Sequence, residues 1–480
     1  MSSSSFILEI KLNTTDHDER VLNERFFHGF LMYNKLVSHA RKCLRGLRQD
    51  KRYRTLMEQY ANAKTKQEQK LLYPELNVLR LAYGLSEYQF HHWISVQQKK
   101  NKNFIDSNTA QKIATRVWKA AEEVIFRKGK TIHHKKLMNF MSMEGKSNAS
   151  GLRYRNGKLF WIGLCIPAPV KKSDYYAQEA LTHRVKYCRI VRKPMGTTWH
   201  FYLQLVLEGI PPKKRTFLPG GDVGIDPGVS VEAIVSKNGC MLTELVSNQE
   251  KIKKEIRRLQ RKMDRSLRAM NPNNYKENGV PKKHQKWLKS KNYKKTQMIL
   301  KTLRRRNTDT IKQSEEILSN EVLCNYGSDI HTEKMNYKAL QSRSKKTKKK
   351  KNGKYRSKKR FGTSIAGHAP SRFLSILERK LSYIGKEVHY VNTQEYKASQ
   401  LDHTTGEYIK PSLKERWKVI DGHNVQRDLY SAFLLMNAYN DELPDIQKCN
   451  DFFPEFLLLH DSCIQELKNK GISKVSVFGF

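Results

Sequence analysis

The spacing of apolar and polar positions changes twice along the chain. Residues 6–12 alternate between apolar and polar side chains and predict a strand. Residues 17–130 are basic and show helical spacing; their clearest helix has one apolar face and begins at Asp106 or Ser107, either of which is a suitable N-cap. From about residue 150 the period falls to two. The pattern therefore predicts a helical region inserted between the first strand of a β domain and its other strands.

Two turn signals support the β domain. An Asn-Gly pair at 156–157 is typical of a type I′ hairpin turn, and a Met-Gly pair at 195–196 separates two further alternating runs. We expect a mostly antiparallel β domain across residues 131–215, completed by the strand in residues 1–16. The sequence PPKKR at 211–215 is typical of a linker.

Apolar strands and helices alternate after this linker. A strand broken by Pro227-Gly228 and a second strand ending near residue 236 come first, and a strongly basic, mostly helical stretch follows at 249–320. A further strand, a helix, a strand and a last helix complete the order, and residues 438–480 are expected to form a mixed tail. This order indicates a mixed α/β sheet without internal repeats.

Three acidic residues stand in separate elements of this second half. Asp226 ends a strand at a Pro-Gly break, Glu333 lies in a later strand, and Asp428 follows Arg427 at the start of a helix. Each has an ordinary explanation on its own, respectively a turn, an ion pair with a lysine and a helix cap. Three carboxylates that converge from separate elements are, however, what a pair of Mg²⁺ ions needs in order to cleave a phosphodiester.

The composition favours a nucleic acid as the substrate. The chain has 480 residues, with 91 Lys and Arg against 46 Asp and Glu, and its formal net charge is +45. A charge of this size favours a polyanion whose binding weakens steeply with salt. A hydrophobic fraction of 38% is sufficient for real cores. A ribosomal or chromatin type of basic protein would not need acidic residues in strand-like apolar settings.

The basic segments are candidates for nucleic-acid contact. Residues 251–305 are expected to line a channel, with a solvated basic face as the alternative. Residues 341–360 contain no acidic residue and are expected to form a loop, acting either as a lid or as a tether without a gating role. The candidate contacts are Lys253, Lys254, Arg257, Arg258, Arg304, Arg305, Arg306, Lys345, Lys346, Lys348, Lys349, Lys350, Lys351 and Arg427.

Aromatic side chains of the helical region give a weaker signal. They interleave with basic residues at Tyr53, Tyr60, Trp93 and Trp118. Stacking on bases is one interpretation. A core role is favoured for each of the four.

Cysteine usage and the N-terminus indicate the compartment. None of the seven cysteines forms a CxxC pair, which is typical of a reduced cytosolic protein without a zinc ribbon. The first residues do not resemble a signal peptide, and no run of about 18 apolar residues is present. We therefore expect a cytoplasmic protein that is nucleoid-associated when bound to DNA; its oligomeric state is not indicated.

The three acidic segments resemble a known family. GIDPG, TEKMNYKAL and QRDLYSAFLL resemble the three motifs of the RuvC-type nuclease domain in the TnpB family. This family comprises transposon-encoded, RNA-guided nucleases ancestral to the type V CRISPR effectors. The resemblance is specific across residues 219–437 and weaker across the N-terminal part, where DSNTAQKIATRVWKAAEEVIF resembles a helix of the recognition lobe.

The resemblance implies both a fold and partners. It implies an RNase H-like RuvC domain across 216–437, a wedge-type antiparallel β-barrel domain, and a helical recognition lobe across 17–130. Asp226, Glu333 and Asp428 become the Mg²⁺ ligands, with Asp226 bridging the two ions. The implied partners are a structured guide RNA and double-stranded DNA beside a short flanking motif.

The chain departs from the family pattern between its second and third motifs. The family usually has a CxxC…CxxC zinc element there, whereas residues 398–424 contain no cysteine. His403 and His423 are too isolated to rebuild such a site, and we expect surface or turn roles for them. No zinc is therefore expected.

The third motif carries Tyr430 where an asparagine is common. This leaves Asp428 as the third ligand. Asp421 is a less favoured alternative because it precedes Gly422 and is typical of a turn.

The hypothesis is an RNA-guided DNA endonuclease, in which base pairing reads the sequence and the protein reads shape and a short flanking motif. An RNA-guided DNA-binding repressor without cleavage is the first alternative. An RNase H-like DNA transposase without a guide is the second, and a simple basic RNA-binding protein the third. The last of these leaves the three acids unexplained.

Overall fold

The structure is a computed structural model that describes residues 4–126, 129–212, 215–247, 249–344, 346–347, 353, 355, 361–410, 412, 415–439, 443–472 and 478–479. The chain divides into an N-terminal unit, Met1–Lys213, and a C-terminal unit, Lys214–Phe480. The division falls within the stretch that the sequence analysis assigned to a linker. Among the described helices, none combines the length and the apolar character needed to cross a bilayer.

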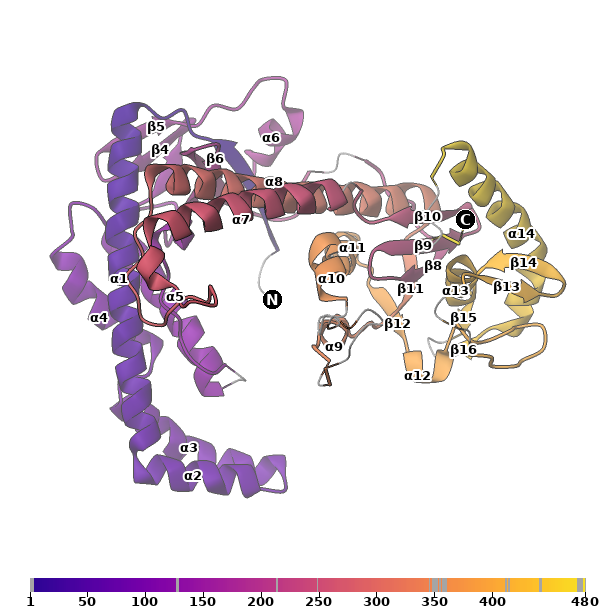
Figure 1. The fold of residues 1–480 in the computed structure, drawn as a ribbon, viewed down its shortest axis with the longest axis horizontal. Coiled ribbons are helices and arrows are strands. Elements are labelled where there is room, and N and C mark those ends of the chain that lie inside the picture. Colours follow the sequence, from indigo (N-terminus) through magenta and orange to yellow (C-terminus); the bar gives the residue numbers. More distant parts are fainter. Residues whose placement is uncertain are drawn as a thin grey trace. The chain divides into compact units, whose positions relative to one another are not determined.

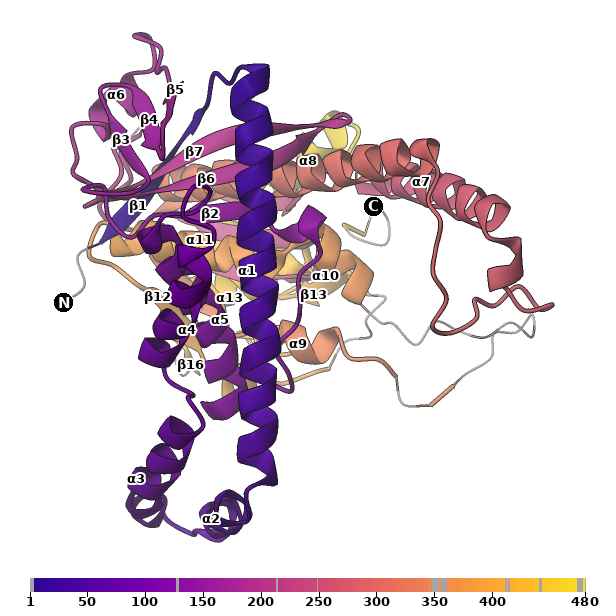
Figure 2. The ribbon, with the colours of Figure 1, turned by 90° about the vertical axis from the view of Figure 1, so that its left-hand side faces the viewer.

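One long helix, α1, organises the N-terminal unit. It begins at a capping box in which the side chains of Thr15 and Asp18 each accept a hydrogen bond from the backbone N–H of the other. Helices α2 and α3 pack together beyond its C-terminal end, and α4 and α5 pack against it and against each other (Figure 2). The helices are α1 Asp16–Gln49, α2 Lys51–Asn62, α3 Lys66–Ala82, α4 Glu87–Lys99, α5 Ser107–Phe126 and α6 Tyr175–Ala180.

Helix α5 confirms the helix predicted from Asp106 onward. Asp106 Oδ1 accepts a hydrogen bond of 3.0 Å from the backbone N–H of Thr109, so Asp106 is the N-cap. Its buried apolar face joins the same hydrophobic core as α1 and the strands of this unit. The core role expected for Trp93 is wrong, because its side chain is 41% exposed; α4 instead buries Phe90 and Ile94.

The strands of the N-terminal unit form two antiparallel sheets. The first has the order β1-β7-β6-β2, so the N-terminal strand does complete it, with Leu8 opposite Leu205. The second has the order β3-β4-β5, and its first turn has positive φ at Asn156 and Gly157, as a type I′ turn requires. The strands are β1 Ser5–Lys11, β2 Ser142–Glu144, β3 Arg153–Arg155, β4 Lys158–Trp161, β5 Leu164–Pro167, β6 Val185–Met195 and β7 Thr198–Glu208.

The expected β-barrel is not observed. Within the described residues both sheets are open, because β1 and β2 each pair on one side only and β3–β5 pair only with one another. The antiparallel part of the prediction is confirmed. Its closure into a barrel is wrong.

A five-stranded mixed sheet lies at the centre of the C-terminal unit. Its order is β10-β9-β8-β11-β12, with β8, β9 and β10 antiparallel and with β11 and β12 parallel to β8. The mixed α/β prediction is confirmed, although the sequence analysis did not identify β10. The strands are β8 Asp222–Pro227, β9 Val231–Ser236, β10 Gly239–Glu244, β11 Asp329–Glu333 and β12 Val388–Val391.

Helices cover both faces of this sheet. Helices α13 and α14 contribute to the core on one face, and α8 and α11 to the core on the other (Figure 1). The basic helices α7 and α8 pack side by side. The helices are α7 Gln249–Met270, α8 Lys291–Glu321, α9 Tyr337–Leu340, α10 Gly362–His368, α11 Pro370–Ser382, α12 Thr393–Tyr396, α13 Arg427–Met436 and α14 Ile446–Asn469.

Helix α13 approaches β8 closely because β8 carries Gly224. A Cβ at this position would lie 1.8 Å from the carbonyl oxygen of Ala432 and 2.4 Å from the backbone nitrogen of Met436. The glycine therefore lets the helix backbone rest directly on the strand. This contact fixes the first turn of α13 near the end of β8.

Two expectations about the end of the chain change. The segment 438–480 contains α14, whose Phe452 and Phe456 are buried in the same core as α13, so this segment is part of the unit and not a separate tail. The surface or turn role expected for His403 is wrong, because its side chain is 2% exposed and its Nδ1 lies 2.7 Å from the Tyr430 hydroxyl.

Two short antiparallel strand pairs lie within residues 417–444. Strand β13, Trp417–Ile420, pairs with β14, His423–Gln426, through a turn at Asp421 and Gly422. The turn role given to Asp421 is confirmed. Strands β15, Ala438–Tyr439, and β16, Leu443–Pro444, form a second small pair. Most of the predicted lid loop at 341–360 lies outside the described residues.

Candidate functional site

Two of the three acids meet because their strands run in parallel. Strands β8 and β11 pair with Ile225 opposite Thr332, so Asp226 and Glu333 follow at the same edge of the sheet. Carboxyl ends of parallel strands are where α/β sheets commonly place polar site residues. The strand end predicted for Asp226 and the strand predicted for Glu333 are therefore observed, and Glu333 is the last residue of its strand.

Asp428 reaches the same edge from α13. The side chain of Gln426 caps this helix by accepting a hydrogen bond of 2.8 Å from the backbone N–H of Leu429, and this places Asp428 in the first helical turn. Because α13 rests on β8, its first turn lies over the strand ends. The three acids line one cavity of about 550 Å³, together with Arg416 and Arg427.

The surroundings of Asp226 and Glu333 disfavour the charged form of both carboxyl groups. Burial raises the pKa of Asp226 well above its ordinary value, and the negative charges of Asp428 and Glu333 raise it further. Arg427 and Arg416 oppose this rise. Burial also raises the pKa of Glu333 to about 7. No lysine, arginine or histidine of the described chain lies within ion-pair distance of Asp226 or Glu333.

Asp428, in contrast, is held by two arginines. Arg416 Nη1 lies 3.3 Å from its Oδ2, and Arg427 Nη2 lies 2.8 Å from its Oδ1. Gln426 Nε2 donates a further, long hydrogen bond of 3.4 Å to Oδ2. Both carboxylate oxygens are therefore already paired within the chain.

The three carboxylates of this cavity are candidate ligands for a metal ion. In the described part of the chain, no group of three or more His, Cys, Asp and Glu side chains is arranged to hold a metal ion. The donor chemistry nevertheless fits Mg²⁺, because carboxylate oxygens are its preferred protein ligands and two partly buried acids without a paired cation favour a divalent one. Asp428 differs from these two acids because both of its carboxylate oxygens are already paired with arginines.

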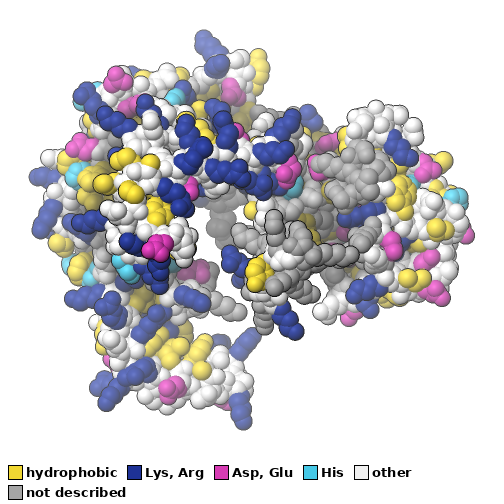
Figure 3. All heavy atoms as spheres, in the orientation of Figure 1, with side chains coloured by type: hydrophobic (Ala, Val, Ile, Leu, Met, Phe, Trp, Pro, Cys, Tyr) yellow, Lys and Arg dark blue, Asp and Glu magenta, His cyan; other side chains and the backbone are white. Residues whose placement is uncertain are grey.

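The candidate nucleic-acid contacts on α7 and α8 are mostly exposed. Lys254, Arg257, Arg304 and Arg306 face solvent, and basic side chains gather along both helices (Figure 3). Three others have acidic neighbours on their own helix, in the pairs Lys253–Glu250, Arg258–Glu255 and Arg305–Asp309.

The remaining candidates lie near or beyond the second acid. Lys346 is exposed. Arg427 is partly buried in its pair with Asp428, at the wall of the acidic cavity. The other candidates lie outside the described residues, namely Lys345, Lys348, Lys349, Lys350 and Lys351.

The sequence analysis missed two charged residues of this region. Arg416 has no motif around it and reaches Asp428 only through the β13–β14 hairpin. Glu232 is fully buried on β9, and neither of its carboxylate oxygens has a hydrogen-bond partner among the described residues. Burial raises the pKa of Glu232 well above its ordinary value, and the charges of Asp226 and Glu315 add to this. A lone acid inside the apolar run VEAIV was the available signal.

The chain was compared with protein families, curated sequences and solved structures, and only solved structures are similar to it. No family model matches the chain, and no curated protein matches its sequence. A solved Cas12f1–sgRNA–target DNA complex is similar with a TM-score of 0.42 and 10% identity, over 91% of this chain and 99% of that chain. A CRISPR–Cas12f ternary complex is similar with a TM-score of 0.25 and 12% identity, over 90% and 99%. Both TM-scores lie below 0.5, so these similarities do not establish a shared fold.

Proposed function

We propose that this chain is an RNA-guided DNA endonuclease with one RuvC-like active site made by Asp226, Glu333 and Asp428. The observation that carries the proposal is the convergence of these three carboxylates on one cavity in a chain of net charge +45. Carboxylates can approach a phosphodiester when a cation mediates between them, as Mg²⁺ does in phosphodiester cleavage. The TnpB-like motifs around the three acids add the expectation of a guide RNA.

The parts of the chain have distinct roles in this proposal. The five-stranded sheet is the RNase H-like nuclease domain, the antiparallel sheets are the wedge domain, and α1–α5 are the recognition lobe. Exposed basic residues of α7 and α8 contact the phosphate backbone of the nucleic acid. The guide pairs with one DNA strand, and the displaced single strand enters the acidic cavity.

Asp226, Glu333 and Asp428 would hold Mg²⁺, which when bound activates a water molecule and stabilises the leaving oxygen. The protein's own contribution is positioning. Strands β8 and β11 hold two carboxylates on rigid backbone. Arg416 and Arg427 neutralise the third and stand at the cavity wall, where guanidinium groups also bind phosphate oxygens. A phosphate that takes an arginine from Asp428 frees that carboxylate, so substrate binding and completion of the donor set are coupled.

The test is cleavage by the purified ribonucleoprotein, expressed with its native flanking sequence so that the guide is retained. Asp226→Ala and Asp226→Asn should abolish cleavage of matched double-stranded DNA in Mg²⁺ while RNA binding and guided DNA binding stay nearly intact. Asp222→Asn is the matched control, because Asp222 lies on the same face of the same strand with its side chain 57% exposed. If an Asp226 variant still cuts, the site assignment is wrong.

The same preparation separates the alternatives. A repressor would bind guided DNA without cutting it in the wild-type form. A transposase would join DNA ends and would carry no specific RNA. A simple RNA-binding protein would carry RNA without any guided DNA binding. The co-purifying RNA therefore separates the transposase, the guided DNA-binding assay separates the simple RNA-binding protein, and the cleavage assay separates the repressor.

A further inference from the structure

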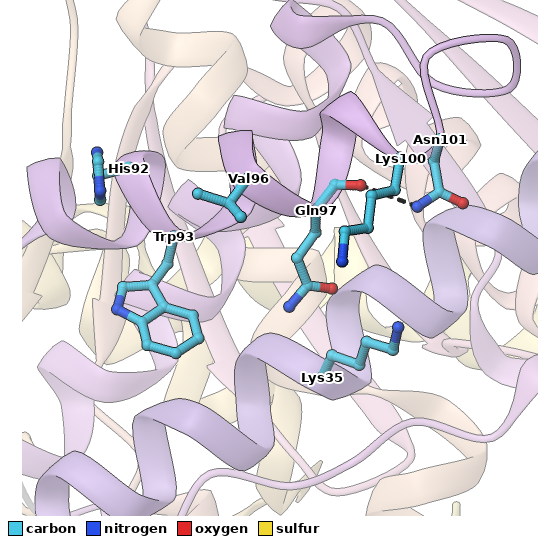
Figure 4. Close-up of a pocket in the computed structure, with 7 residues that line it drawn as sticks. All are labelled: Lys35, His92, Trp93, Val96, Gln97, Lys100 and Asn101. Atoms are coloured by element: carbon cyan, nitrogen blue, oxygen red, sulfur yellow. Dashed lines mark hydrogen bonds between the residues drawn. The ribbon is translucent and has the colours of Figure 1, made fainter.

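The N-terminal unit contains a cavity lined by aromatic, basic and amide side chains. Its volume is about 680 Å³, and residues of α1 and α4 line it (Figure 4). This size lies in the usual range for small-ligand sites. Its described lining combines an indole ring, the imidazole of His92, an aliphatic side chain, two lysines and side-chain amides, and contains no acidic residue.

Trp93 presents a supported aromatic surface to this cavity. Its ring stacks on His39 of α1, with the two ring centroids 3.3 Å apart and the planes inclined by 26°. Burial lowers the pKa of His39, and the charge of Lys42 lowers it further, so the stacked imidazole is neutral at neutral pH. The indole nevertheless remains 41% exposed, and the adjacent Val96 is 52% exposed. A ring held from one side and open to solvent is suited to stacking on a base.

The polar groups around Trp93 match the rest of a nucleotide. Among the described residues, neither Lys35 nor Lys100 is in an ion pair, so both charges are free for phosphate. Gln97 Oε1 is shielded from solvent and has no hydrogen-bond partner there. The Asn101 amide is already fixed, with its Oδ1 2.7 Å from His28 Nδ1 and its Nδ2 donating to the Gln97 carbonyl oxygen at 2.9 Å. In this side-chain conformation a ligand in the cavity does not reach the shielded Gln97 Oε1, so the two lysines are the polar groups that are available to it.

We propose that this cavity binds one unpaired nucleotide, with its base on Trp93 and Val96 and its flanking phosphates at Lys35 and Lys100. A base within a duplex has both faces covered by its neighbours and cannot make this stack. Single-stranded RNA and single-stranded DNA share the required chemistry. The site lies away from the acidic cavity in sequence and in unit, so the proposal stands whether or not that cavity cleaves DNA.

A spectroscopic experiment tests the site directly. The full-length protein, freed of nucleic acid, is labelled with 5-fluorotryptophan, and Trp93→Phe identifies the ¹⁹F resonance of Trp93 among those of the six tryptophans. The labelled protein is titrated without Mg²⁺ against single-stranded RNA and single-stranded DNA of the same sequence, each about twelve nucleotides long. The corresponding duplex and inorganic phosphate are titrated in parallel. The Trp93 resonance should shift with single strands only, and the strand that shifts it identifies the source. No shift at saturation, established by anisotropy, or an equal shift with duplex or phosphate would overturn the proposal.

Variants test the energetic contribution of the stack. Trp93→Ala should weaken single-strand binding about tenfold or more, without changing its salt dependence, because stacking releases no counterions. Trp93→Phe keeps a ring and should retain most of the affinity. Lys35→Gln should reduce the salt slope by about 1. The control is Tyr88→Ala, on the same helix and 78% exposed outside the cavity. Wild-type affinity in Trp93→Ala, or an equal loss in Tyr88→Ala, contradicts the proposal.

Discussion

Glu333 makes a quantitative prediction about stability, because burial alone accounts for the rise of its pKa from 4.5 to about 7. A carboxyl group with a higher pKa in the folded chain binds its proton more tightly there than in the unfolded chain. Its contribution to stability is therefore fully present below pH 4.5 and is lost as the pH rises through 7. Compared with a carboxyl group whose pKa stays at 4.5, Glu333 lowers the free energy of unfolding by about 1 kcal/mol at pH 5 and by about 3 kcal/mol at pH 8.5.

Glu333→Gln removes this titration while preserving the shape of the side chain. In the absence of Mg²⁺, the variant should be more stable than the wild type by those amounts. Hydrogen exchange of peptides from β8 and β11 measures the difference locally, which matters because a chain of two units need not unfold in one step. Comparing both proteins at the same pH cancels the intrinsic exchange rate. The variant should exchange about fourfold more slowly at pH 5 and more than a hundredfold more slowly at pH 8.5.

Mg²⁺ provides the second arm of this experiment. If the cavity binds the cation, Mg²⁺ should protect β8 and β11 in the wild type at pH 8.5 and should protect them less in Glu333→Gln. Glu395→Gln, at an exposed position on α12, is the control and should match the wild type in both arms. A stability difference that does not grow with pH would refute the reasoning from burial. Equal protection of both proteins by Mg²⁺ would refute the role of Glu333 as a ligand.

Two further perturbations test how the site is supported. Gly224→Ala should destabilise the C-terminal unit by about 3 kcal/mol, because the added Cβ would lie 1.8 Å from the Ala432 carbonyl oxygen. Gly362→Ala is the control and should not destabilise it, because the atom nearest to its Cβ is 3.9 Å away. Equal thermal stability of the two variants would contradict the close packing of α13. Burial lowers the pKa of His403, so the unfolded chain binds its proton more tightly and protection of α13 from exchange should fall as the pH drops below about 6.5. His403→Gln should lose this dependence, and an unchanged profile would mean that another group titrates.

Local signals in the sequence were sufficient for several elements. The Asn-Gly pair at 156–157 specified its hairpin because a type I′ turn needs positive φ at both positions, and the Pro-Gly break after Asp226 located the end of β8. Parallel pairing then brings strand ends to one edge. This is why two acids more than 100 positions apart could be expected to lie together.

The same kind of signal was overlooked at β10. An Asn-Gly pair stands at 238–239, and β9 and β10 pair with Ser236 opposite Gly239. The strand itself, GCMLTE, contains few β-branched residues and lacks a clear alternation, so its pattern alone does not predict it. Its place at the edge of the sheet depends on the core side chains that α14 supplies.

Burial was harder to predict wherever the partners come from distant segments. His403 packs against Tyr430, Phe433 and Phe453, which belong to two different helices. No spacing of apolar residues within 398–424 indicates these contacts. Trp93 shows the opposite error, since a core role was favoured for it and its side chain is 41% exposed. The helix buries only the stripe that contains Phe90 and Ile94.

The charge environment of Asp428 is a tertiary property that no motif encodes. Its helical start could be predicted, but the guanidinium of Arg416 reaches it because the turn at Asp421-Gly422 pairs Trp417 with Gln426 and brings Arg416 beside Arg427. The backbone N–H of Arg427 donates to the Arg416 carbonyl oxygen at 2.8 Å, which continues the pairing by one residue. A two-residue turn sets the register of its hairpin, and a slip by one residue moves every side chain to the other face. The availability of the third carboxylate for a cation is therefore controlled by a hairpin that lies outside all three recognised motifs.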